Sequence, residues 1–456
     1  MTANSAVSPP EKRLRVLLVP DWEFWVLGTI AKGIAKANPW MDATIVSGPI
    51  LDELYSRDPA FFDRFDLVHF ICPYASKKWL GPLRSQLPVV TSHHHVTEWA
   101  AVSHNIEADA IIAGSTQWSR DLVERGALEP RVFTVPYGVD TNLFAPVSAG
   151  QKSSTRSRLG LSDDAAVVGF FAKRGSNDDD RKGIDVFSSA VRMLHRDLGN
   201  AAVLIVGPGW REMVDDLREA GVTCVWIPFV NEISDVAVLY RALDFYWVTA
   251  RVEGGPVPLL EAMSSGLCAL TTRVGLANDV VVDGVNAVFI EMNDPSSFAR
   301  ETVRLWKDET ARKKIGEEAR RTMVEGMHDQ KTLQGVRAAY DRAIEVFAAR
   351  TGKSLARVPD LRTARHVTTG SAWRSGLTKR ERRLVESRES LSWSEHLMIY
   401  EGQRPAAFRL MLRAWMLQPL TVTPVRTMLR LMLPTRMVRG IVTVKRGILS
   451  RSTSAG

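Results

Sequence analysis

The stretch ARVEGGPVPLLEAMSSGLCALTTRVG, residues 250–275, decides the fold prediction. The apolar run just before it, residues 245–249, predicts a buried strand, and a helix is expected to open near Val257. The Gly-Gly-Pro turn between them places Glu253 and Glu261 at one strand-to-helix junction. Free backbone N–H groups at a helix N-terminus suit an anionic ligand. Glu261 lies about one helical turn further in, where a carboxylate can accept hydrogen bonds from a sugar diol.

Short apolar runs alternate with helical patterns along most of the chain. Such runs predict parallel strands that helices cover on both faces. The expected strands are residues 15–19, 43–47, 67–72, 88–92, 110–114 and 132–135, and then 166–172, 201–207, 223–227, 244–249, 267–272 and 286–290. We therefore expect an α/β protein with two doubly wound, Rossmann-like domains that face a cleft. Ligands would bind at the carboxyl ends of the strands.

Domain boundaries follow from length and composition. A chain of 456 residues is too long for one core, and the Ser/Gly-rich segment 147–155 is linker-like. We expect domains over residues 1–150 and 151–329. A closing helix over 330–350, for which a return to the first domain is one option, precedes a basic helical extension over 351–456.

Two segments carry a resemblance to a known family. Residues 250–275 resemble the glutamate signature of the family 4 retaining glycosyltransferases, the "glycosyl transferases group 1" type, whose fold is called GT-B. Residues 135–146, VPYGVDTNLFAP, resemble the segment with which these enzymes leave their N-terminal domain. The resemblance covers residues 13–350. It is strong in the second domain and thinner in the first.

The resemblance implies a function. A retaining, metal-independent transferase of the hexosyltransferase type would move a sugar from a nucleotide-sugar donor to a glycan or lipid-linked acceptor. The first domain would hold the acceptor and the second the nucleotide sugar. Two alternatives are a nucleotide-sugar epimerase or hydrolase of the same fold, and a non-catalytic scaffold protein that keeps the fold.

The family's donor contacts can be placed on this sequence. In the family, the first Glu and the glycines after it face the donor sugar and phosphates, and the second Glu holds the ribose. The matching residues here are Glu253, Gly254, Gly255 and Glu261.

Diphosphate charge must be neutralised as the sugar leaves, and fixed cations do this without reorganising. Family members carry an Arg at the end of the second domain's first strand and a Lys before a Gly a few residues later. Lys182 matches the second position. Lys173 or Arg174 occupies the first, with a longer loop between.

The resemblance also assigns a base contact and a catalytic histidine. Pro228 and Phe229 match the loop that contacts the nucleotide base. His93 is the best match to a His placed against the donor sugar, with His94 as the alternative register. The expected role is orientation and electrostatic support of an oxocarbenium-like transition state.

Neither a metal nor another cofactor is expected. Residues 178–180, three aspartates, fit the Asp-x-Asp pattern of metal-dependent glycosyltransferases. They lie between cations in a loop, and GT-B enzymes generally work without a bound metal. We interpret them as a solvated acidic turn, with a metal site as the minority alternative.

The loop after the first strand departs from the family. Many members have a Gly-Gly pair there, whereas this chain has Trp22, Phe24 and Trp25. Aromatic rings can stack on a sugar face, so we predict that this loop shapes the acceptor pocket. Packing of the rings between the domains is the alternative.

Positive charge is concentrated in the last quarter of the chain. Residues 351–456 hold 20 Lys and Arg against 6 Asp and Glu, which leaves 39 against 45 elsewhere. Residues 404–451 carry ten Lys and Arg and no acid, and Phe408, Met411, Leu412 and Trp415 share one helical face. A basic amphipathic helix predicts an anionic membrane surface as partner. Packing on the body or an oligomer interface is the alternative; nucleic acid is not expected, because no binding module accompanies the charge.

Location is inferred from the remaining composition. No apolar run approaches the roughly 20 residues of a spanning helix, and no signal peptide precedes the first strand. The three cysteines are scattered and lack metal-ligand spacing. We expect a cytoplasmic protein, peripheral on the inner face of the membrane.

Overall fold

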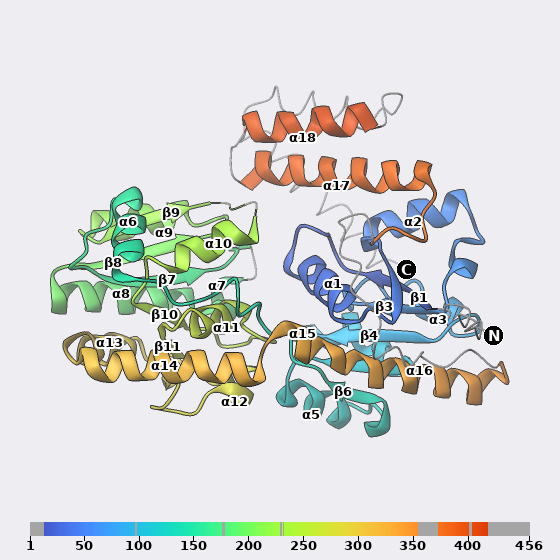
Figure 1. Ribbon diagram of the computed structural model, residues 1–456, viewed down its shortest axis with the longest axis horizontal. Coiled ribbons are helices and arrows are strands. Elements are labelled where there is room, and N and C mark those ends of the chain that lie inside the picture. The colour runs from blue at the N-terminus through green and yellow to red at the C-terminus, as the bar shows by residue number, and fades with distance from the viewer. Residues whose placement is uncertain are drawn as a thin grey trace, which may run out of the picture.

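Two α/β domains lie side by side, and a helical hairpin near the C-terminus lies over the first (Figure 1). The computed structural model describes residues 13–95, 98–175, 178–228, 230, 232–353, 373–400 and 404–417. The predicted architecture of two doubly wound domains with a helical extension is confirmed.

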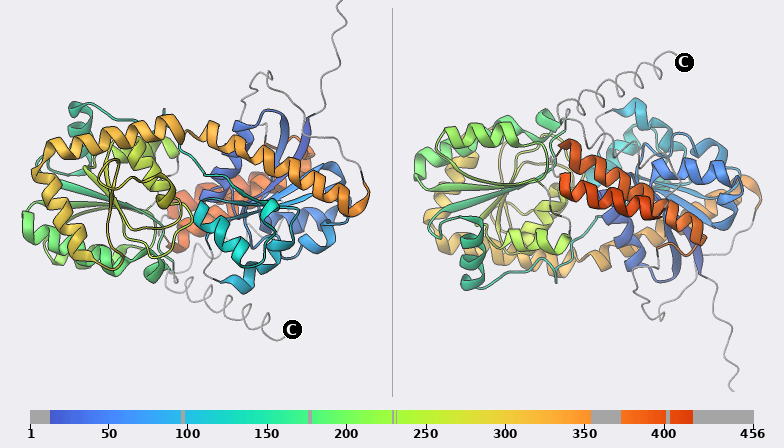
Figure 2. Two further views of the ribbon diagram at one scale, coloured as in Figure 1. Left: turned by 90° about the horizontal axis from the view of Figure 1, so that it is seen from below. Right: turned by 90° about the horizontal axis from the view of Figure 1, so that it is seen from above.

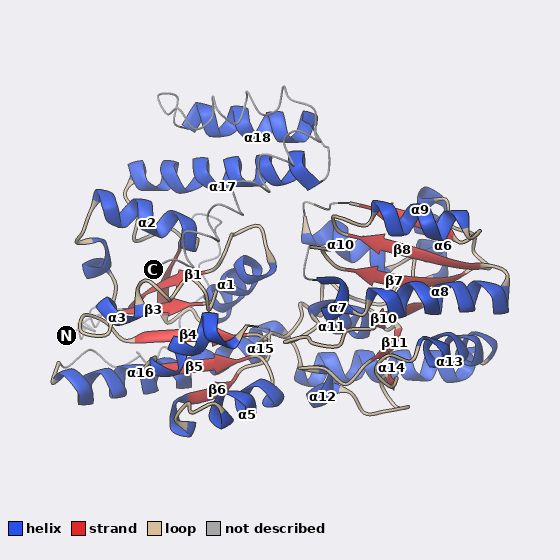
Figure 3. Ribbon diagram, turned by 180° about the vertical axis from the view of Figure 1, so that it is seen from behind, coloured by secondary structure: helices blue, strands red, loops and turns tan. Residues whose placement is uncertain are grey.

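Each domain is built on a parallel sheet of six strands, with helices on both faces (Figure 3). The first sheet has the order β2-β1-β3-β4-β5-β6, and the second has the order β12-β11-β10-β7-β8-β9. The strands are β1 (Leu14–Val19), β2 (Met41–Ile45), β3 (Leu67–Phe70), β4 (Val89–His93), β5 (Ala110–Ala113), β6 (Val132–Thr134), β7 (Ala166–Phe171), β8 (Ala201–Val206), β9 (Thr223–Ile227), β10 (Phe245–Val248), β11 (Cys268–Thr271) and β12 (Val288–Phe289).

The helices of the two domains connect these strands. Those of the first domain are α1 (Val26–Ala37), α2 (Gly48–Arg57), α3 (Leu80–Leu83), α4 (Trp99–Val102) and α5 (Thr116–Glu124), with 3-10 turns η1 (Phe61–Arg64), η2 (Ser103–Glu107) and η3 (Glu129–Arg131). Those of the second are α6 (Ala149–Leu159), α7 (Asp178–Lys182), α8 (Ile184–Leu198), α9 (Arg211–Glu219), α10 (Ile233–Tyr240), α11 (Val257–Ser264), α12 (Ala277–Val280), α13 (Pro295–Lys307) and α14 (Glu309–Gly326).

The strands are mainly apolar because both faces of each sheet are buried. In β7, Val167 and Phe171 enter one apolar layer, whereas Val168 and Phe170 enter the layer on the opposite face. This alternation follows from the two-residue period of a strand. A sheet buried on both sides exposes its loops only at the strand ends, so a ligand site must form there.

The chain returns to the first domain after the second sheet is complete. It continues through α15 (Asp329–Thr332), η4 (Leu333–Gly335) and α16 (Val336–Thr351). These helices follow α14 along one side of both domains (Figure 2). The Tyr340 hydroxyl lies 2.9 Å from Nδ1 of His69 on β3, and Arg350 pairs with Asp109 at 2.8 Å. The helix α16 thus belongs structurally to the first domain.

The hairpin consists of α17 (Lys379–Tyr400) and α18 (Arg404–Leu417). Ion pairs tie α17 to the first domain: Arg388 meets Glu53 at 2.7 Å, and Glu381 meets Arg64 at 2.8 Å. Among the described residues, no helix is both long and apolar enough to span a membrane.

Candidate active site

The candidate site lies where the strand order of the second sheet reverses, between β7 and β10. Connections leave the carboxyl ends of these two strands in opposite directions, which opens a space for a ligand between their loops. The loop after β7 leads to α7 and α8, and the loop after β10 contains the two-glutamate turn. The topology therefore brings together two segments that lie about 70 residues apart in sequence.

Glu253 is the centre of a charged cluster at this point. Its Oε1 atom lies 2.8 Å from Nη1 of Arg181 and 3.4 Å from Nζ of Lys182, and its side chain is 17% exposed. Burial opposes ionisation of this carboxyl, but Lys182, Arg181 and His95 outweigh it and lower the pKa of Glu253. The carboxylate is thus ionised at neutral pH, with two cations held around it.

The N-terminus of α8 lies directly behind these cations. Gly183 is its N-cap residue at φ 61°, and a Cβ there would lie 2.1 Å from the carbonyl oxygen of Thr249. The Thr249 hydroxyl also donates to the carbonyl of Lys182 at 2.9 Å. Because the N-cap residue is a glycine, it has no side chain that could cap the helix. Fixed cations together with the positive end of a 15-residue helix form a site for a bound anion.

The two glycines after Glu253 pack against the first domain. A Cβ on Gly254 would lie 1.9 Å from the carbonyl oxygen of His94, and one on Gly255 would lie 2.5 Å from the ring of Tyr137. The indole N–H of Trp118 donates to the carbonyl of Glu253 at 2.9 Å. These contacts require glycine and fix the turn at the domain junction.

Glu261 is the fifth of the eight residues of α11 and is buried with 7% exposure. The Tyr240 hydroxyl donates to its Oε2 atom at 2.7 Å. Burial raises the pKa of Glu261 to about 7, although the Tyr240 hydrogen bond opposes the shift. The protonation of this carboxyl therefore changes within the neutral range, unlike that of Glu253.

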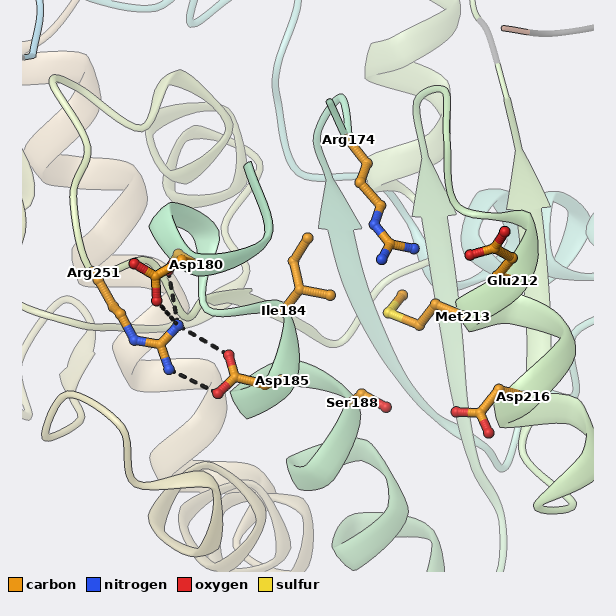
Figure 4. Close-up of a pocket in the computed structure, with 9 residues that line it drawn as sticks. All are labelled: Arg174, Asp180, Ile184, Asp185, Ser188, Glu212, Met213, Asp216 and Arg251. Atoms are coloured by element: carbon orange, nitrogen blue, oxygen red, sulfur yellow. Dashed lines mark hydrogen bonds and ion pairs between the residues drawn. The ribbon is translucent and has the colours of Figure 1, made fainter. Parts of the chain in front are cut away.

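Lys173 and Arg174, the two candidates for the first phosphate cation, point to different places. The Lys173 ammonium lies 4.7 Å from the centre of the Trp25 ring of the first domain. Arg174 instead points into a cavity of about 540 Å³ that Asp180, Asp185 and other residues of α7, α8 and α9 line (Figure 4). The Lys173 contact thus lies at the domain junction, and the role of either residue in phosphate binding stays a prediction.

The histidines after β4 differ from the predicted arrangement. His93 is 0% exposed and its ring meets Trp99 edge-on at 6.1 Å, so it points into the first domain. Burial lowers its pKa to about 4, and neither ring nitrogen has a hydrogen-bond partner among the described residues. His94 bonds Tyr137 at 2.5 Å and Ile71 at 2.8 Å.

The histidine with an electrostatic effect on the glutamate turn is His95, which helps to lower the pKa of Glu253. His95 is thus close enough to Glu253 to affect its ionisation, and the catalytic role of His93 stays a prediction. The sequence does not show which face of β4 each side chain lies on, because a strand buried on both faces lacks the alternation of apolar and polar residues.

The remaining predicted positions have mixed outcomes. Pro228 is half-buried after β9, while Phe229 lies outside the described residues. Residues 178–180 open α7, and Asp180 pairs with Arg251 at 3.3 Å. Over the described ranges, no group of three His, Cys, Asp or Glu side chains could hold a metal ion. Metal independence stays a prediction.

Residues 163–322 match the family model described as "Glycosyl transferases group 1". The second domain is therefore similar to this family. D-inositol 3-phosphate glycosyltransferase 1 of Catenulispora acidiphila is 33% identical over 220 residues, which cover 45% of this chain and 50% of the relative. The D-inositol 3-phosphate glycosyltransferase of Xylanimonas cellulosilytica is 26% identical over 350 residues, covering 70% and 80%. The chain spans about half the length of the first relatives that it matches.

Solved structures show the same fold. Sucrose-phosphate synthase from Thermosynechococcus elongatus superposes with a TM-score of 0.61 at 16% identity and covers 74% of this chain and 100% of its own. Anabaena HepE in complex with UDP and glucose superposes with a TM-score of 0.60 at 17% identity, covering 71% and 98%. The protein therefore has the GT-B fold of these structures over about three quarters of its chain.

Three neighbours of the site were not predicted from sequence. Arg181 directly precedes Lys182 in the DDDRKG string, and this position could have indicated that it belongs to the site. Tyr240 lies 21 residues before Glu261, and its hydroxyl position depends on the packing of α10 against α11. The position of His95 could be predicted only if the last residue of β4 were known.

Proposed function

We propose that the protein is a retaining glycosyltransferase that moves a sugar from a nucleotide-sugar donor to a glycan or lipid-linked acceptor, without a bound metal. The observation that carries this proposal is the ion-pair cluster of Glu253 with Arg181 and Lys182 at the N-terminus of α8. The UDP and glucose bound to Anabaena HepE, a protein of the same fold, support a nucleoside diphosphate as the anion.

The cluster has the charge that a diphosphate leaving group needs. When a diphosphate enters, its oxygens compete with the Glu253 carboxylate for Arg181 and Lys182. The bond between the sugar's anomeric carbon and the phosphate oxygen breaks, and the electron pair stays on that oxygen. Because the two cations are already in place, they stabilise this charge without reorganisation. They supply what a metal ion supplies in other transferases, which is why we propose metal independence.

The other half of the reaction involves the acceptor and Glu253. The acceptor hydroxyl attacks the anomeric carbon from the face that the diphosphate leaves, and its proton passes to the departing phosphate oxygen. The configuration is thereby retained. Glu253, released from its cations, would accept hydrogen bonds from the sugar hydroxyls, and Glu261 would accept them from the ribose.

We also propose that the hairpin contacts an anionic membrane surface, which suits a lipid-linked acceptor and a peripheral position on the cytoplasmic face. In α18, Phe408, Leu412, Trp415 and Met416 are 40–65% exposed, and the nearby arginines of this helix are exposed as well. The prediction that Met411 belongs to the same free face is wrong, because it is buried with Ala407 and Ala414 against α17.

Flotation with vesicles tests the membrane contact. The full chain should float with vesicles that contain anionic lipid and not with neutral ones, since apolar insertion and charge act together. Leu412→Glu should abolish flotation. Val324→Glu, a change at a similarly exposed position of α14, is the control and should leave it intact. Equal flotation of both variants would exclude the α18 surface.

Product analysis tests the transferase function. The full chain is incubated with UDP-, GDP- or ADP-sugars and candidate acceptors in EDTA, and the products are examined by NMR for the anomeric configuration. A product that keeps the donor's configuration supports the proposal. Free sugar or an epimerised donor, formed equally without acceptor, would instead indicate a hydrolase or epimerase.

A further inference from the structure

The loop after β1 is held by the C-terminal hairpin and not by its own domain alone. Phe24 and Trp393 of α17 have ring centres 4.4 Å apart, and Trp25 meets the ring of His396 edge-on at 4.7 Å. Trp393 and His396 stack on each other at 5.3 Å with an angle of 3°. Four rings from two segments more than 360 residues apart thus form one cluster.

Polar contacts anchor the same loop to the hairpin segment. Arg374, which precedes α17, donates from one guanidinium nitrogen to both carboxylate oxygens of Glu23 at 3.0 and 3.1 Å, and the carboxyl of Glu389 on α17 accepts the backbone N–H of Glu23. The hairpin lies over the first domain and reaches toward the second in both views (Figure 2). The loop is therefore fixed from the side that carries the extension.

Lys173 of the second domain meets this cluster. Its ammonium lies 4.7 Å from the centre of the Trp25 ring. Burial and the nearby Lys173 charge both lower the pKa of His396. Burial raises the pKa of Asp21 in the same loop, while Lys173 opposes the rise. Lys173, which belongs to the second domain, thus interacts with Trp25 and Asp21 of the first domain and with His396 of the extension.

We propose that Trp393 and His396 are positioning residues of the donor site: they hold the Trp25 ring, and the ring holds Lys173 where it meets the diphosphate. This inference rests on the proposed function. A cation over an indole face is attracted by the ring while its N–H groups on the far side stay directed away from it. Without Trp393 and His396, the Trp25 ring loses its packing contacts and Lys173 is no longer held in place. Only the binding of the diphosphate part of the ligand should therefore weaken.

The affinity for the donor therefore depends on the position of the hairpin. The contacts of Trp393 and His396 lie on the face of α17 toward the loop, while α18 packs elsewhere on α17 through Leu391 and Met411. A change at the loop-facing side should act on the diphosphate site. A change elsewhere on α17 should not.

The test compares nucleoside diphosphates with their monophosphates by calorimetry on the full chain. Trp393→Ala and His396→Ala should each raise the Kd of the preferred diphosphate among UDP, GDP and ADP by about fivefold. The Kd of the matching monophosphate should stay unchanged. Trp393→Phe should restore the wild-type ratio, because it restores a ring beside Phe24.

Two controls separate positioning from general damage. Arg388→Ala removes the ion pair with Glu53 on the same helix and should leave the ratio of the two Kd values within about twofold of wild type. In a Lys173→Met background, Trp393→Ala should have no further effect, since the two residues act through one contact.

The outcomes are distinct. Equal weakening of mono- and diphosphate, an Arg388→Ala effect as large as that of Trp393→Ala, or additive losses in the double variant would each overturn the positioning role. If Trp393→Ala does not fold, His396→Ala decides alone. Failure of the wild-type chain to bind any of the three diphosphates would contradict the proposed function itself, and so is distinguishable from failure of this inference.

Discussion

Lys182 and Arg181 share one carboxylate partner, Glu253, and both become available when that partner changes. Each is held at a fixed place: Thr249 binds the backbone of Lys182, and Arg181 accepts the backbone N–H of Arg251 on its carbonyl at 2.8 Å. Charges that are fixed in this way act on a developing negative charge more strongly than flexible surface charges do.

Lys182→Met should therefore lower kcat/KM for sugar transfer by about 100-fold, since it keeps the length of the side chain and removes only its charge. Steady-state kinetics with the preferred donor would measure this. Lys182→Arg is the matched control and should retain most of the activity. A Lys182→Met enzyme within about threefold of wild type would show that this cation does not meet the diphosphate.

Glu261 predicts a pH dependence of donor binding. Its pKa of about 7 means that the carboxyl is mostly protonated at pH 6 and mostly ionised at pH 8. An ionised carboxylate accepts two hydrogen bonds from a diol, so donor affinity should rise by up to about tenfold over this range. Titration of a UDP-, GDP- or ADP-sugar at several pH values measures it, because these diesters do not titrate there. Glu261→Gln should flatten the profile, and an unchanged profile in that variant would exclude Glu261 as its origin.

At the scale of elements, α8 depends on how closely its N-terminus approaches β10. Both ends of this helix carry a glycine at positive φ: Gly183 at 61° and Gly199 at 74°. Gly183 faces the Thr249 carbonyl, whereas a Cβ at Gly199 would meet nothing within 4 Å. Substitution of Gly199 therefore measures backbone strain alone, whereas substitution of Gly183 measures strain together with a steric clash.

Gly199→Ala should cost about 1–2 kcal/mol, the strain of a left-handed alanine. Gly183→Ala should cost more, because its Cβ also displaces the backbone that carries Lys182, and it should weaken donor binding as well. Urea unfolding and donor titration of both variants measure the two effects. Equal stability losses would mean that the helix can move away from β10 without cost.

The hairpin should be more stably docked in acid than in alkaline solution. Burial and the nearby Glu23 raise the pKa of Glu389 to about 8, despite the opposing Ser47 hydrogen bond. A carboxyl with a raised folded-state pKa contributes stability that is complete below its unfolded pKa of about 4.5 and is lost as pH rises through 8.

Glu389→Gln removes this ionisation, so it should raise Tm relative to wild type more at pH 9 than at pH 6. Thermal unfolding followed by tryptophan fluorescence, to which Trp393 contributes, measures the difference. Glu386→Gln, a change at a neighbouring carboxyl of the same helix, is the control and should show no such trend. The same Tm difference at both pH values would place the titration elsewhere.

For the whole molecule, the sequence predicted most of the fold because alternating apolar runs determine a doubly wound sheet. All twelve predicted strands occur, some of them shorter. The sequence also placed Lys182 and Glu253 in one site, because their segments follow two neighbouring parallel strands of one sheet: Lys182 ends α7 after β7, and Glu253 lies in the turn after β10.

The differences arise where sequence has no local signal. Which of three consecutive histidines faces Glu253 depends on the last residue of a strand buried on both faces. The aromatic loop was expected to shape an acceptor pocket or pack between the domains. Its partners Trp393 and His396 lie in an extension for which the family resemblance offers no template. Long-range packing of this kind depends on tertiary structure that neither periodicity nor composition encodes.

Thermal shift of the full chain with UDP-, GDP- and ADP-sugars, with and without EDTA, decides whether a metal-free nucleotide-sugar site lies between β7 and β10. We expect one base to raise Tm selectively and EDTA to leave the shift unchanged. A ligand at 100 times its Kd stabilises the folded state by about 2.7 kcal/mol. A shift that EDTA removes would contradict the metal-free site, and the absence of any shift with all three would contradict a nucleotide-sugar site between β7 and β10.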